Sequence, residues 1–348
     1  MEDTYGQFLE YLEKNSSIIR SSMILDERND LRKRLEPMYG ETYHDPPPYD
    51  PGPLKVAATD SSEFIRELYN GKKIILIRSF TKMGNRIWNH FISEVIDVDR
   101  DVLRNFTILL MEHSEHVSTL KMLEDVDRPD YILLDGSLIG RMRHRNQRIG
   151  AENYENFMKE YFSTLARLVE TCLEKNIPLI FVAKSSESRI LKDFMIARSF
   201  SGSEVNRFRS VTDHVVVRSF SKKPGYTSPI CITLRNPESS SGKSLGIATF
   251  HIMPYIMDVP MKIDVVSCEI QNDLHNEPET VHIDQNLIGF LFWGYTGLRV
   301  HNIWLAEVDK LVKFNNKEIE ELYMKTFERE IGIEFYETRG ERRARIRI

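Results

Sequence analysis

The spacing of hydrophobic residues changes along the chain, and each change predicts a different kind of element. Over residues 1–44, apolar side chains recur at helix-like intervals, which predicts one or two helices. Residues 45–53, DPPPYDPGP, hold five prolines in nine positions, so they can form neither a helix nor the interior of a sheet. We therefore expect a helical N-terminal arm and a proline-rich linker over residues 1–53.

From residue 54 onward, strand-like runs alternate with helical ones. VAATDSSEF and KKIILIRSF are two apolar runs separated by a segment with Asn70-Gly71, which favours a hairpin turn. A third strand is expected over 92–97. The next hundred residues predict a helix, a strand, a helix, a strand and a helix, at 101–125, 130–134, 152–175, 177–183 and from 187. This alternation is typical of helices packed on a sheet with parallel strands.

The rest of the chain predicts more strands and then helices. Apolar runs after residue 213 are interpreted as strands, namely HVVVRSF, SPICITL, IATFHIM and KIDVVSCEI. The last third is helical, with candidates near 281–292, 301–313 and 317–330. The predicted class is a mixed α/β body with additional helices at both ends.

Composition excludes several classes of protein. The chain has 348 residues, of which 41% are hydrophobic and 28% charged, so a large core can form and general disorder is excluded. The longest apolar runs are far shorter than the ~20 residues that span a bilayer, and the acidic start MEDTYGQF is no secretory signal. The three cysteines are widely spaced, which fits a reducing cytoplasm better than a disulfide framework.

Two basic stretches stand out against the net charge of −5. Residues 141–148, RMRHRNQR, hold four arginines and no acid, and residues 339–348 hold five arginines against one glutamate. A local positive field of this kind can bind a polyanion even in a mildly acidic protein. The alternative for each stretch is a solvated face or a frayed tail.

Two familiar motifs are incomplete. Ser241-Gly242-Lys243-Ser244 resembles half of a phosphate-binding P-loop, but Pro237 stands where the first glycine is needed. His113 and His116 form H-x-x-H, which is not the order of a zinc protease. They could share a metal on one helix face, or they are ordinary exposed helix residues.

Three acidic residues are candidates for a metal site. Asp60 and Asp135 come at the ends of apolar strands, and Glu112 follows an apolar run in the helix between them. A carboxylate at such a position is costly unless it is paired, hydrogen-bonded or bound to a metal. Converging carboxylates suit Mg²⁺ or Mn²⁺ and phosphoryl transfer. Turn or N-cap chemistry is the alternative for each acid taken alone.

These residues lie in motifs that resemble the NurA nuclease family. The motifs are AATDSSEF, LLMEHSEH, YILLDGSLIGR and IPLIFVAKSSESRIL, with WGYTGLRVH near the end. They follow the family's order over about 54–313, and YILLDGSL followed by VAKSSES is the most specific part. The resemblance implies an RNase H-like mixed sheet flanked by helices over 54–333, with an Arg-rich tail over 334–348.

The resemblance also implies roles for single residues. Asp60, Glu112 and Asp135 would bind Mn²⁺ or Mg²⁺. Lys184 would meet the scissile phosphate or its developing charge. His301 would steer a phosphate or take part in proton transfer.

Two of the implied positions have neighbours that compete for the role. Glu115 lies one helical turn after Glu112 and could replace it, although Glu112 directly follows the apolar run. Tyr295 is the expected aromatic partner of the late histidine, but Trp293 stands eight residues before the histidine, where the family places its first aromatic residue.

The resemblance finally implies substrates and partners. Family members are prokaryotic homodimers around a DNA channel and act in DNA-end resection with the hexameric HerA translocase. The implied activity is a 5′→3′ exonuclease on single- and double-stranded DNA with single-strand endonuclease activity. Alternatives are a catalytically silent DNA-binding or docking module and a metal-dependent ribonuclease. The implied phosphate contacts are Arg141, Arg143, Arg145 and Arg148.

Overall fold

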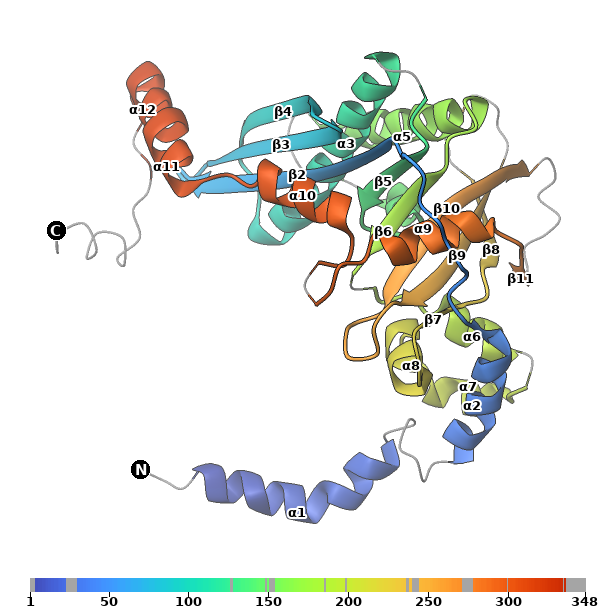
Figure 1. The fold of residues 1–348 in the computed structure, drawn as a ribbon. Coiled ribbons are helices and arrows are strands. Elements are labelled where there is room, and N and C mark those ends of the chain that lie inside the picture. Colours follow the sequence, from blue (N-terminus) through green and yellow to red (C-terminus); the bar gives the residue numbers. More distant parts are fainter. Residues whose placement is uncertain are drawn as a thin grey trace.

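The structure is a computed structural model that describes most of the chain (Figure 1). The described residues are 4–22, 30–125, 128–147, 149, 154–184, 186–197, 199–235, 238–239, 244–270, 278–298, 300–333 and 335. The expected phosphate contact Arg148 lies outside them, as does the expected tail over 334–348 apart from Phe335.

One mixed sheet forms the centre of the molecule, in the order β1-β7-β9-β10-β6-β5-β2-β3-β4, with β8 pairing β9 and β11 pairing β8. Its strands are β1 (Tyr43–His44), β2 (Val56–Glu67), β3 (Lys73–Met83), β4 (Arg86–Ile96), β5 (Tyr131–Asp135), β6 (Leu179–Ala183), β7 (Gly225–Thr227), β8 (Ile230–Arg235), β9 (Ser244–Met253), β10 (Met261–Ile270) and β11 (Glu279–Thr280).

The order of the first five long strands sets the class of the fold. Strands β2, β3 and β4 form an antiparallel meander, β5 pairs with β2 in parallel, and β6 pairs with β5 in parallel. The hairpin turn at Asn70-Gly71 is confirmed, since Gly71 has a φ of 83°, a value that favours glycine. Three antiparallel strands followed by two parallel ones form an RNase H-like arrangement, so the predicted fold class is confirmed.

Helices cover both faces of this sheet. The helices are α1 (Thr4–Ser22), α2 (Asp30–Thr42), α3 (Arg100–Asp125), α4 (Leu138–Arg143), η1 (His144–Asn146), α5 (Phe157–Glu174), α6 (Ile190–Ala197), α7 (Gly202–Arg207), α8 (Asp213–Phe220), α9 (Gln285–Trp293), α10 (Ile303–Val312), α11 (Asn316–Glu318), η2 (Ile319–Met324) and α12 (Lys325–Ile331). Helices α3 and α5 pack on one face of the sheet and α9 and α10 on the other.

The two cores follow from the alternation of side chains along the strands. Ala57, Ile132 and Phe181 point toward α3 and α5 and belong to one buried cluster. Their neighbours Leu133 and Ile180 belong to the other cluster, under α9 and α10. Strands buried on both faces need continuous apolar runs, which explains why these strands could be predicted from sequence.

One predicted strand is wrong. Residues 214–220 lie in the helix α8. The buried residues Val216, Val217 and Phe220 recur at helical spacing and pack against α2 and α6 in a third apolar cluster. The valines favour strands, but tertiary burial of one helical face overrides that preference.

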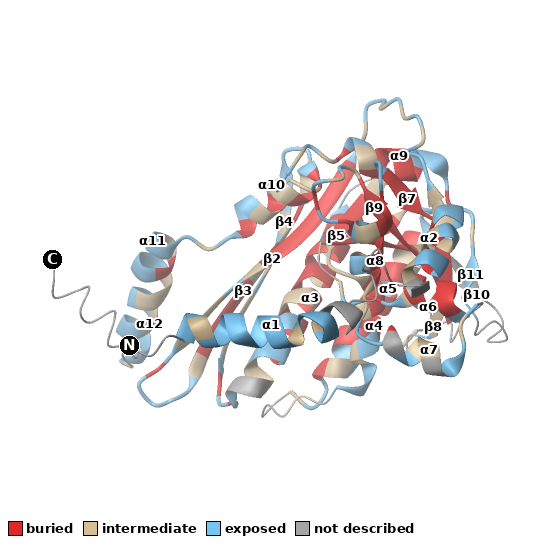
Figure 2. Cartoon of the chain, turned by 90° about the horizontal axis from the view of Figure 1, so that it is seen from below, coloured by how far each residue is buried: buried red, intermediate tan, exposed pale blue. Residues whose placement is uncertain are grey.

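The N-terminal segment has two parts. In the view of Figure 2, α1 is exposed over most of its length, whereas the central strands β5 and β9 are mostly buried. Leu35 and Tyr39 of α2 are buried against α6 and α8, and β1 pairs with β7. Residues 35–44 therefore pack on the body. The domain boundary at residue 53 stays a prediction.

The C-terminal helices are attached at the far end of the β2–β3 hairpin. Arg78 of β3 donates to the carbonyl oxygen of Val312 at 2.6 Å and pairs with Glu318 at 2.6 Å. Phe335 forms an isolated bridge to Leu68. These contacts hold α11 and the elements after it against the sheet.

We predict opposite effects for alanine at two glycines inside helices. A Cβ at Gly289 of α9 would lie 2.6 Å from the Cβ of Tyr49, so Gly289→Ala should destabilise the fold by about 1–3 kcal/mol through overpacking. Gly40 of α2 has no atom within 4 Å of such a Cβ, so Gly40→Ala should stabilise by up to ~1 kcal/mol. Urea unfolding measures both changes, and equal changes in the two variants would contradict the packing of residues 45–53 on α9.

Candidate active site

The parallel pairing of β2, β5 and β6 lines up three candidate residues. Thr59 of β2 is paired with Leu134 of β5, so the residues that follow them, Asp60 and Asp135, lie side by side. Adjacent strands are about 4.8 Å apart. Strand β6 is the next parallel neighbour, and Lys184 follows its last residue. The expectation that Asp60 ends a strand is wrong, because β2 continues to Glu67. Asp60 lies where the parallel pairing of β2 with β5 stops, at the same end of the parallel strands as Asp135 and Lys184.

Asp60 and Asp135 also point to the same face of the sheet. Val56 and Ala58 lie four and two residues before Asp60, and Leu133 lies two residues before Asp135, so they share the face of the aspartates. These three apolar residues pack under α9 and α10. Both carboxylates thus face the side of the sheet that α10 covers. Each accepts a hydrogen bond from the next backbone N–H, at 2.7 Å for Asp60 and 3.1 Å for Asp135.

The electrostatics of Asp60 are unusual. Its side chain is 8% exposed, and burial raises its pKa to about 8, with further increases from the negative charges of Glu115 and Asp135. A smaller contribution comes from Asp309 of α10. A buried carboxylate close to other carboxylates cannot ionise easily unless a cation joins it.

Lys184 lies within reach of this pair. Its Nζ is 3.9 Å from Oδ2 of Asp135, and its side chain is 37% exposed. The ammonium group therefore borders Asp135 on one side and solvent on the other. This placement suits a contact with an anionic substrate.

The structure separates the two glutamates of α3. Glu115 accepts a hydrogen bond from the hydroxyl of Ser61, the residue after Asp60, and its charge acts on Asp60. Glu112 instead accepts from the hydroxyl of Tyr161 at 2.6 Å and lies 3.3 Å from Nε2 of His144. Of the two glutamates, Glu115 is thus the one whose charge acts on Asp60, and the assignment of Glu112 as a metal ligand stays a prediction.

Arg141 is not a surface residue, which corrects its expected role as a phosphate contact. Its side chain is 2% exposed and forms an ion pair with Glu115. It also donates to Nε2 of His116 at 2.7 Å and to the carbonyl oxygen of Asp135 at 2.8 Å. The guanidinium thus ties α3 to the end of β5. Since His113 and His116 are both buried, the expectation that they are exposed is wrong too.

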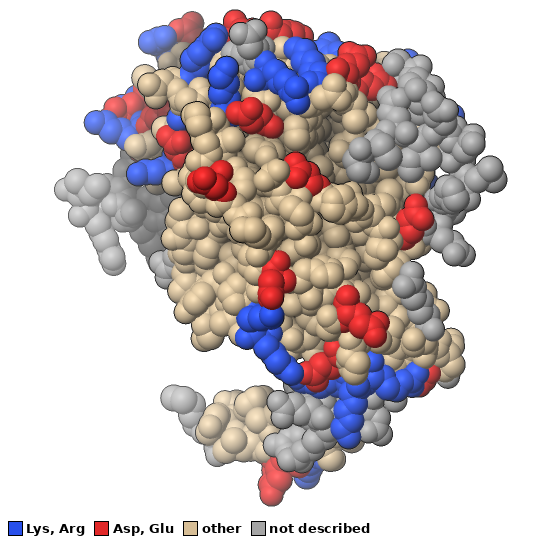
Figure 3. All heavy atoms as spheres, turned by 45° about the vertical axis from the view of Figure 1, so that its right-hand side comes forward, with Lys and Arg blue, Asp and Glu red and all other residues tan. Residues whose placement is uncertain are grey.

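The other two described arginines of this stretch are available to solvent. Arg143 at the end of α4 and Arg145 in η1 are exposed. On the face drawn in Figure 3, Lys and Arg side chains lie mainly toward the upper and lower ends, where Asp and Glu side chains lie among them.

The two late residues share a carboxylate that the sequence did not reveal. Tyr295 donates its hydroxyl to Oδ2 of Asp258 at 2.9 Å, and Nδ1 of His301 lies 3.5 Å from the same oxygen. Burial and the Asp258 carboxylate raise the pKa of Tyr295 to about 12. Trp293 is half exposed and packs near Tyr49 and Trp304. The geometry thus pairs His301 with Tyr295 through Asp258.

Asp258 lies at the same end of the sheet as the acidic pair. It precedes β10, whose Lys262 is paired with Ala183, the last residue of β6. Arg218 of α8 donates to the carbonyl oxygen of Asp258 and fixes this loop. An isolated aspartate in a loop between two strands carries no sequence signal for such a role.

A second unpredicted group lies on α10. Lys313 pairs with Asp309 at 2.7 Å, and both interact with the charge of Asp60. In the sequence these two residues, four apart on a predicted helix, look like an ordinary surface ion pair.

The acidic pair fits a hard divalent cation in part. Asp60 and Asp135 supply carboxylate oxygens, the ligands that Mg²⁺ and Mn²⁺ prefer, and a cation would relieve the repulsion that raises the pKa of Asp60. Among the residues described, no three His, Cys, Asp or Glu side chains converge closely enough to form a metal cluster. The described residues thus offer two carboxylates at neighbouring positions of adjacent strands.

Comparison with protein families gives a clear result. The family model described as "NurA domain" matches residues 54–314, three quarters of the chain. The chain belongs to the NurA family. A comparison with curated proteins finds no match. Within the described residues, no helix combines the length and apolarity that crossing a membrane requires.

Solved NurA structures share the fold at low sequence identity. The NurA nuclease from Sulfolobus solfataricus is 15% identical with a TM-score of 0.63, over 95% of this chain and 98% of that one. A NurA bound to dAMP and manganese is 12% identical with a TM-score of 0.55, over 90% of this chain and 96% of that one. A NurA with manganese is 13% identical with a TM-score of 0.54, over 91% and 96%.

The raised pKa of Asp60 predicts a pH dependence of stability in EDTA. Between about pH 4 and pH 8 the folded protein retains the Asp60 proton, whereas the unfolded chain releases it near pH 4. The free energy of unfolding contributed by this group therefore falls as the pH rises through this window. Asp60→Asn should remove that fall and be more stable than wild type at pH 8 by more than ~1 kcal/mol.

Urea unfolding of wild type and Asp60→Asn at several pH values measures this difference. The other titrating groups are present in both proteins, so their contributions cancel in the difference between the two free energies of unfolding. Parallel stability curves would show that Asp60 has an ordinary pKa.

Proposed function

We propose that the protein is a divalent-metal-dependent DNA nuclease. The observation that carries the proposal is the placement of Asp60 and Asp135 side by side on one face of the sheet, with Lys184 3.9 Å from Asp135. The family membership supports it, as do the related structures described as a nuclease and as bound to dAMP and manganese.

In this proposal Asp60 and Asp135 hold Mn²⁺ or Mg²⁺, and Glu115 supports them from α3. Such a cation would neutralise charge on the phosphodiester and lower the pKa of a bound water. Lys184 binds a non-bridging phosphate oxygen and stabilises charge that develops during cleavage. The N–H groups of Ser61 and Gly136 keep the two carboxylates oriented.

His301 and Tyr295 supply a polar group on the same side of the sheet. The Asp258 carboxylate orients the Tyr295 hydroxyl by a hydrogen bond and lies beside the His301 ring. We propose that His301 donates a hydrogen bond or a proton to the phosphate. Tyr295 stays protonated, because its pKa is raised to about 12, and its single O–H is donated to Asp258 and holds that carboxylate beside His301.

The finer activities follow from the family and not from the geometry. We propose a 5′→3′ exonuclease on single- and double-stranded DNA with single-strand endonuclease activity. Its setting would be cytoplasmic DNA-end resection for double-strand break repair, as a homodimer beside a HerA-type hexameric ATPase. Arg145 and Arg148, together with Arg143, would contact DNA phosphates without reading sequence.

We predict that the acidic residues divide into two groups in a cleavage assay. Asp135→Asn should reduce cleavage of end-labelled linear DNA in Mn²⁺ by about 100-fold or more, because it removes a ligand charge from the cation site. Glu115→Gln should also reduce cleavage, because it breaks the ion pair with Arg141 that ties α3 to the end of β5. Glu112→Gln should keep activity within about tenfold. Asp97→Asn is a control for an exposed acid outside the site.

Circular dichroism checks folding, since Glu115→Gln leaves the buried Arg141 without its ionic partner. Full activity of Asp135→Asn would place the metal elsewhere. If the wild-type protein binds DNA but does not cleave it in the presence of any metal ion, the protein is a docking module. Faster cleavage of a matched RNA strand would make it a ribonuclease.

We also predict that Asp258 acts through its two partners. Asp258→Asn keeps the shape but loses the charge, so kcat should fall by about tenfold or more, with a smaller change in KM. In a His301→Gln background, Asp258→Asn should lower kcat by less than a third of the factor that it has in the wild-type background. The effects of substitutions at residues that act as a unit are not additive. Fully additive losses in this double-mutant cycle would contradict the coupling.

A further inference from the structure

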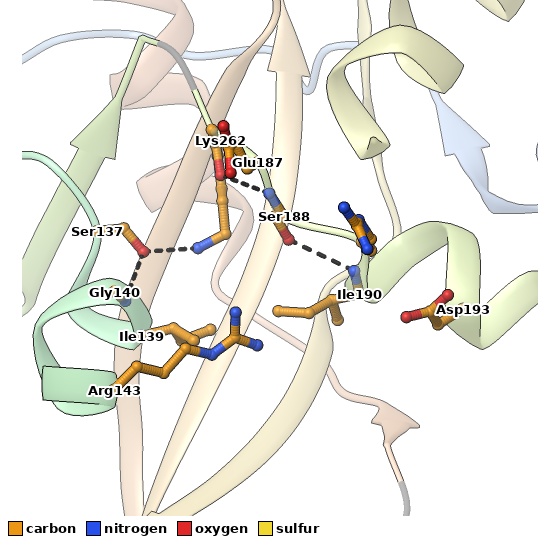
Figure 4. A pocket seen from close by; sticks show the side chains of 11 residues that line it. Ser137, Ile139, Gly140, Arg143, Glu187, Ser188, Ile190, Asp193 and Lys262 are labelled. Carbon is orange, nitrogen blue, oxygen red and sulfur yellow. Dashed lines mark hydrogen bonds between the residues drawn. The ribbon is translucent and has the colours of Figure 1, made fainter. Parts of the chain in front are cut away.

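A polar cavity lies at the same end of the parallel strands as the acidic pair. It has a volume of about 540 Å³ and lies between the loop after β5 and the loop after β6 (Figure 4). Its lining residues are Ser137, Ile139, Gly140, Arg143, Ser186, Glu187, Ser188, Arg189, Ile190, Asp193 and Lys262. Ligands of open α/β sheets bind in such crevices outside the carboxyl ends of the strands.

Each wall of the cavity is fixed by a buried aspartate. Asp264 of β10 accepts from the hydroxyl of Ser137 at 2.6 Å and from the backbone N–H of Ile139 at 3.2 Å. Lys262 neutralises Asp264 and donates to the Ser137 hydroxyl at 2.9 Å, as Figure 4 shows. This network holds the loop after β5.

The loop after β6 is held in the same way from α8. Asp213, which is fully buried, accepts from the hydroxyl of Ser188 at 2.7 Å and from the backbone N–H of Lys192 at 2.8 Å. Both walls are therefore preorganised without a ligand, which lowers the free-energy cost of binding one.

Some of the charged side chains that line the cavity form ion pairs, and others do not. Asp193 is paired with Lys192 at 3.0 Å, and Lys262 is paired with Asp264. By contrast, the exposed side chains of Arg143 and Arg189 form no hydrogen bond or ion pair within the described part of the chain. Glu187 is the acid that opposes them. Two free guanidinium groups from different loops thus face one preformed cavity.

We propose that this cavity is a phosphate subsite for the DNA strand, one step beyond the cleaved bond. Guanidinium groups bind phosphate oxygens by paired, charge-assisted hydrogen bonds. The cavity lies at the same end of the parallel strands as the proposed centre, because Ser137 and Ser186 line it and follow Asp135 and Lys184, respectively, by two residues. This inference rests on the proposed nuclease function and adds where the neighbouring phosphate is held.

Binding in EDTA tests the subsite without requiring cleavage. Arg143→Gln and Arg189→Gln should each raise the Kd of a short fluorescent single-stranded oligonucleotide about tenfold. Each should also reduce the slope of log Kd against log salt by about 0.7, the value for one phosphate contact on a single strand. Glu187→Gln should lower the Kd by about two- to threefold, since it removes the opposing charge.

Arg167→Gln is the matched control. Arg167 is an exposed arginine of α5 that lies 3.8 Å from Glu124 and does not line the cavity, so its loss should change the Kd less than twofold. A purely structural role of the cavity residues would not tighten binding in Glu187→Gln. Unchanged Kd values and salt slopes in both arginine variants would overturn the subsite.

Competition by dinucleotides identifies the occupant. If a terminal phosphate binds, a 5′-phosphorylated dinucleotide should compete better than its 5′-hydroxyl form, and both arginine variants should abolish the difference. If an internal phosphodiester binds, the two dinucleotides should compete equally, and both should compete less well for the two arginine variants than for the wild type. Competition that neither variant alters would reject both forms of the proposal. Wild-type binding of this kind without any Mn²⁺-dependent cleavage would reject the nuclease function and leave the subsite.

Discussion

The parallel register of β2, β5 and β6 is the constraint on which the rest of the site depends. Because Thr59 is paired with Leu134, the next residues bring two carboxylates together at one end of the strands and on one face. A shift of one residue in either strand would turn one carboxylate to the opposite face. The apolar residues before them, which are buried on both sides of the sheet, fix that register.

The loops after these strands are fixed by a repeated arrangement. Asp264 lies beneath the loop after β5 and Asp213 beneath the loop after β6, and each accepts both a serine hydroxyl and a backbone N–H. A buried aspartate of this kind is stable only when its acceptor sites are filled. The same hydrogen bonds that satisfy it therefore keep the loop conformations that place Asp135 and Lys184.

The sequence could predict the strands, and the pairing of Asp60 with Asp135 at neighbouring positions, because both depend on local apolar runs that are followed by a carboxylate. It could not reveal how Glu112 and Glu115 differ, although they lie one turn apart on the same helix, because the contacts of Glu115 with Ser61 and Arg141 are tertiary. Arg141 lies in an arginine-rich stretch that looks solvated, and only the turn into α4 brings it inside. No sequence motif around Asp258 marks it as a residue that contacts Tyr295 and lies beside His301.

The balance of charge around the acidic pair argues for a cation at this place. The groups that act on one another there are four carboxylates, those of Asp60, Glu115, Asp135 and Asp309. The basic groups paired with them are three, namely Arg141, Lys184 and Lys313. Glu115, Asp135 and Asp309 each have one of these partners, so Asp60 is the carboxylate left without an adjacent cation. In the protein alone a raised pKa, and hence a bound proton, resolves this excess. A divalent ion would resolve it with both aspartates ionised and would add a positive charge that attracts a phosphodiester.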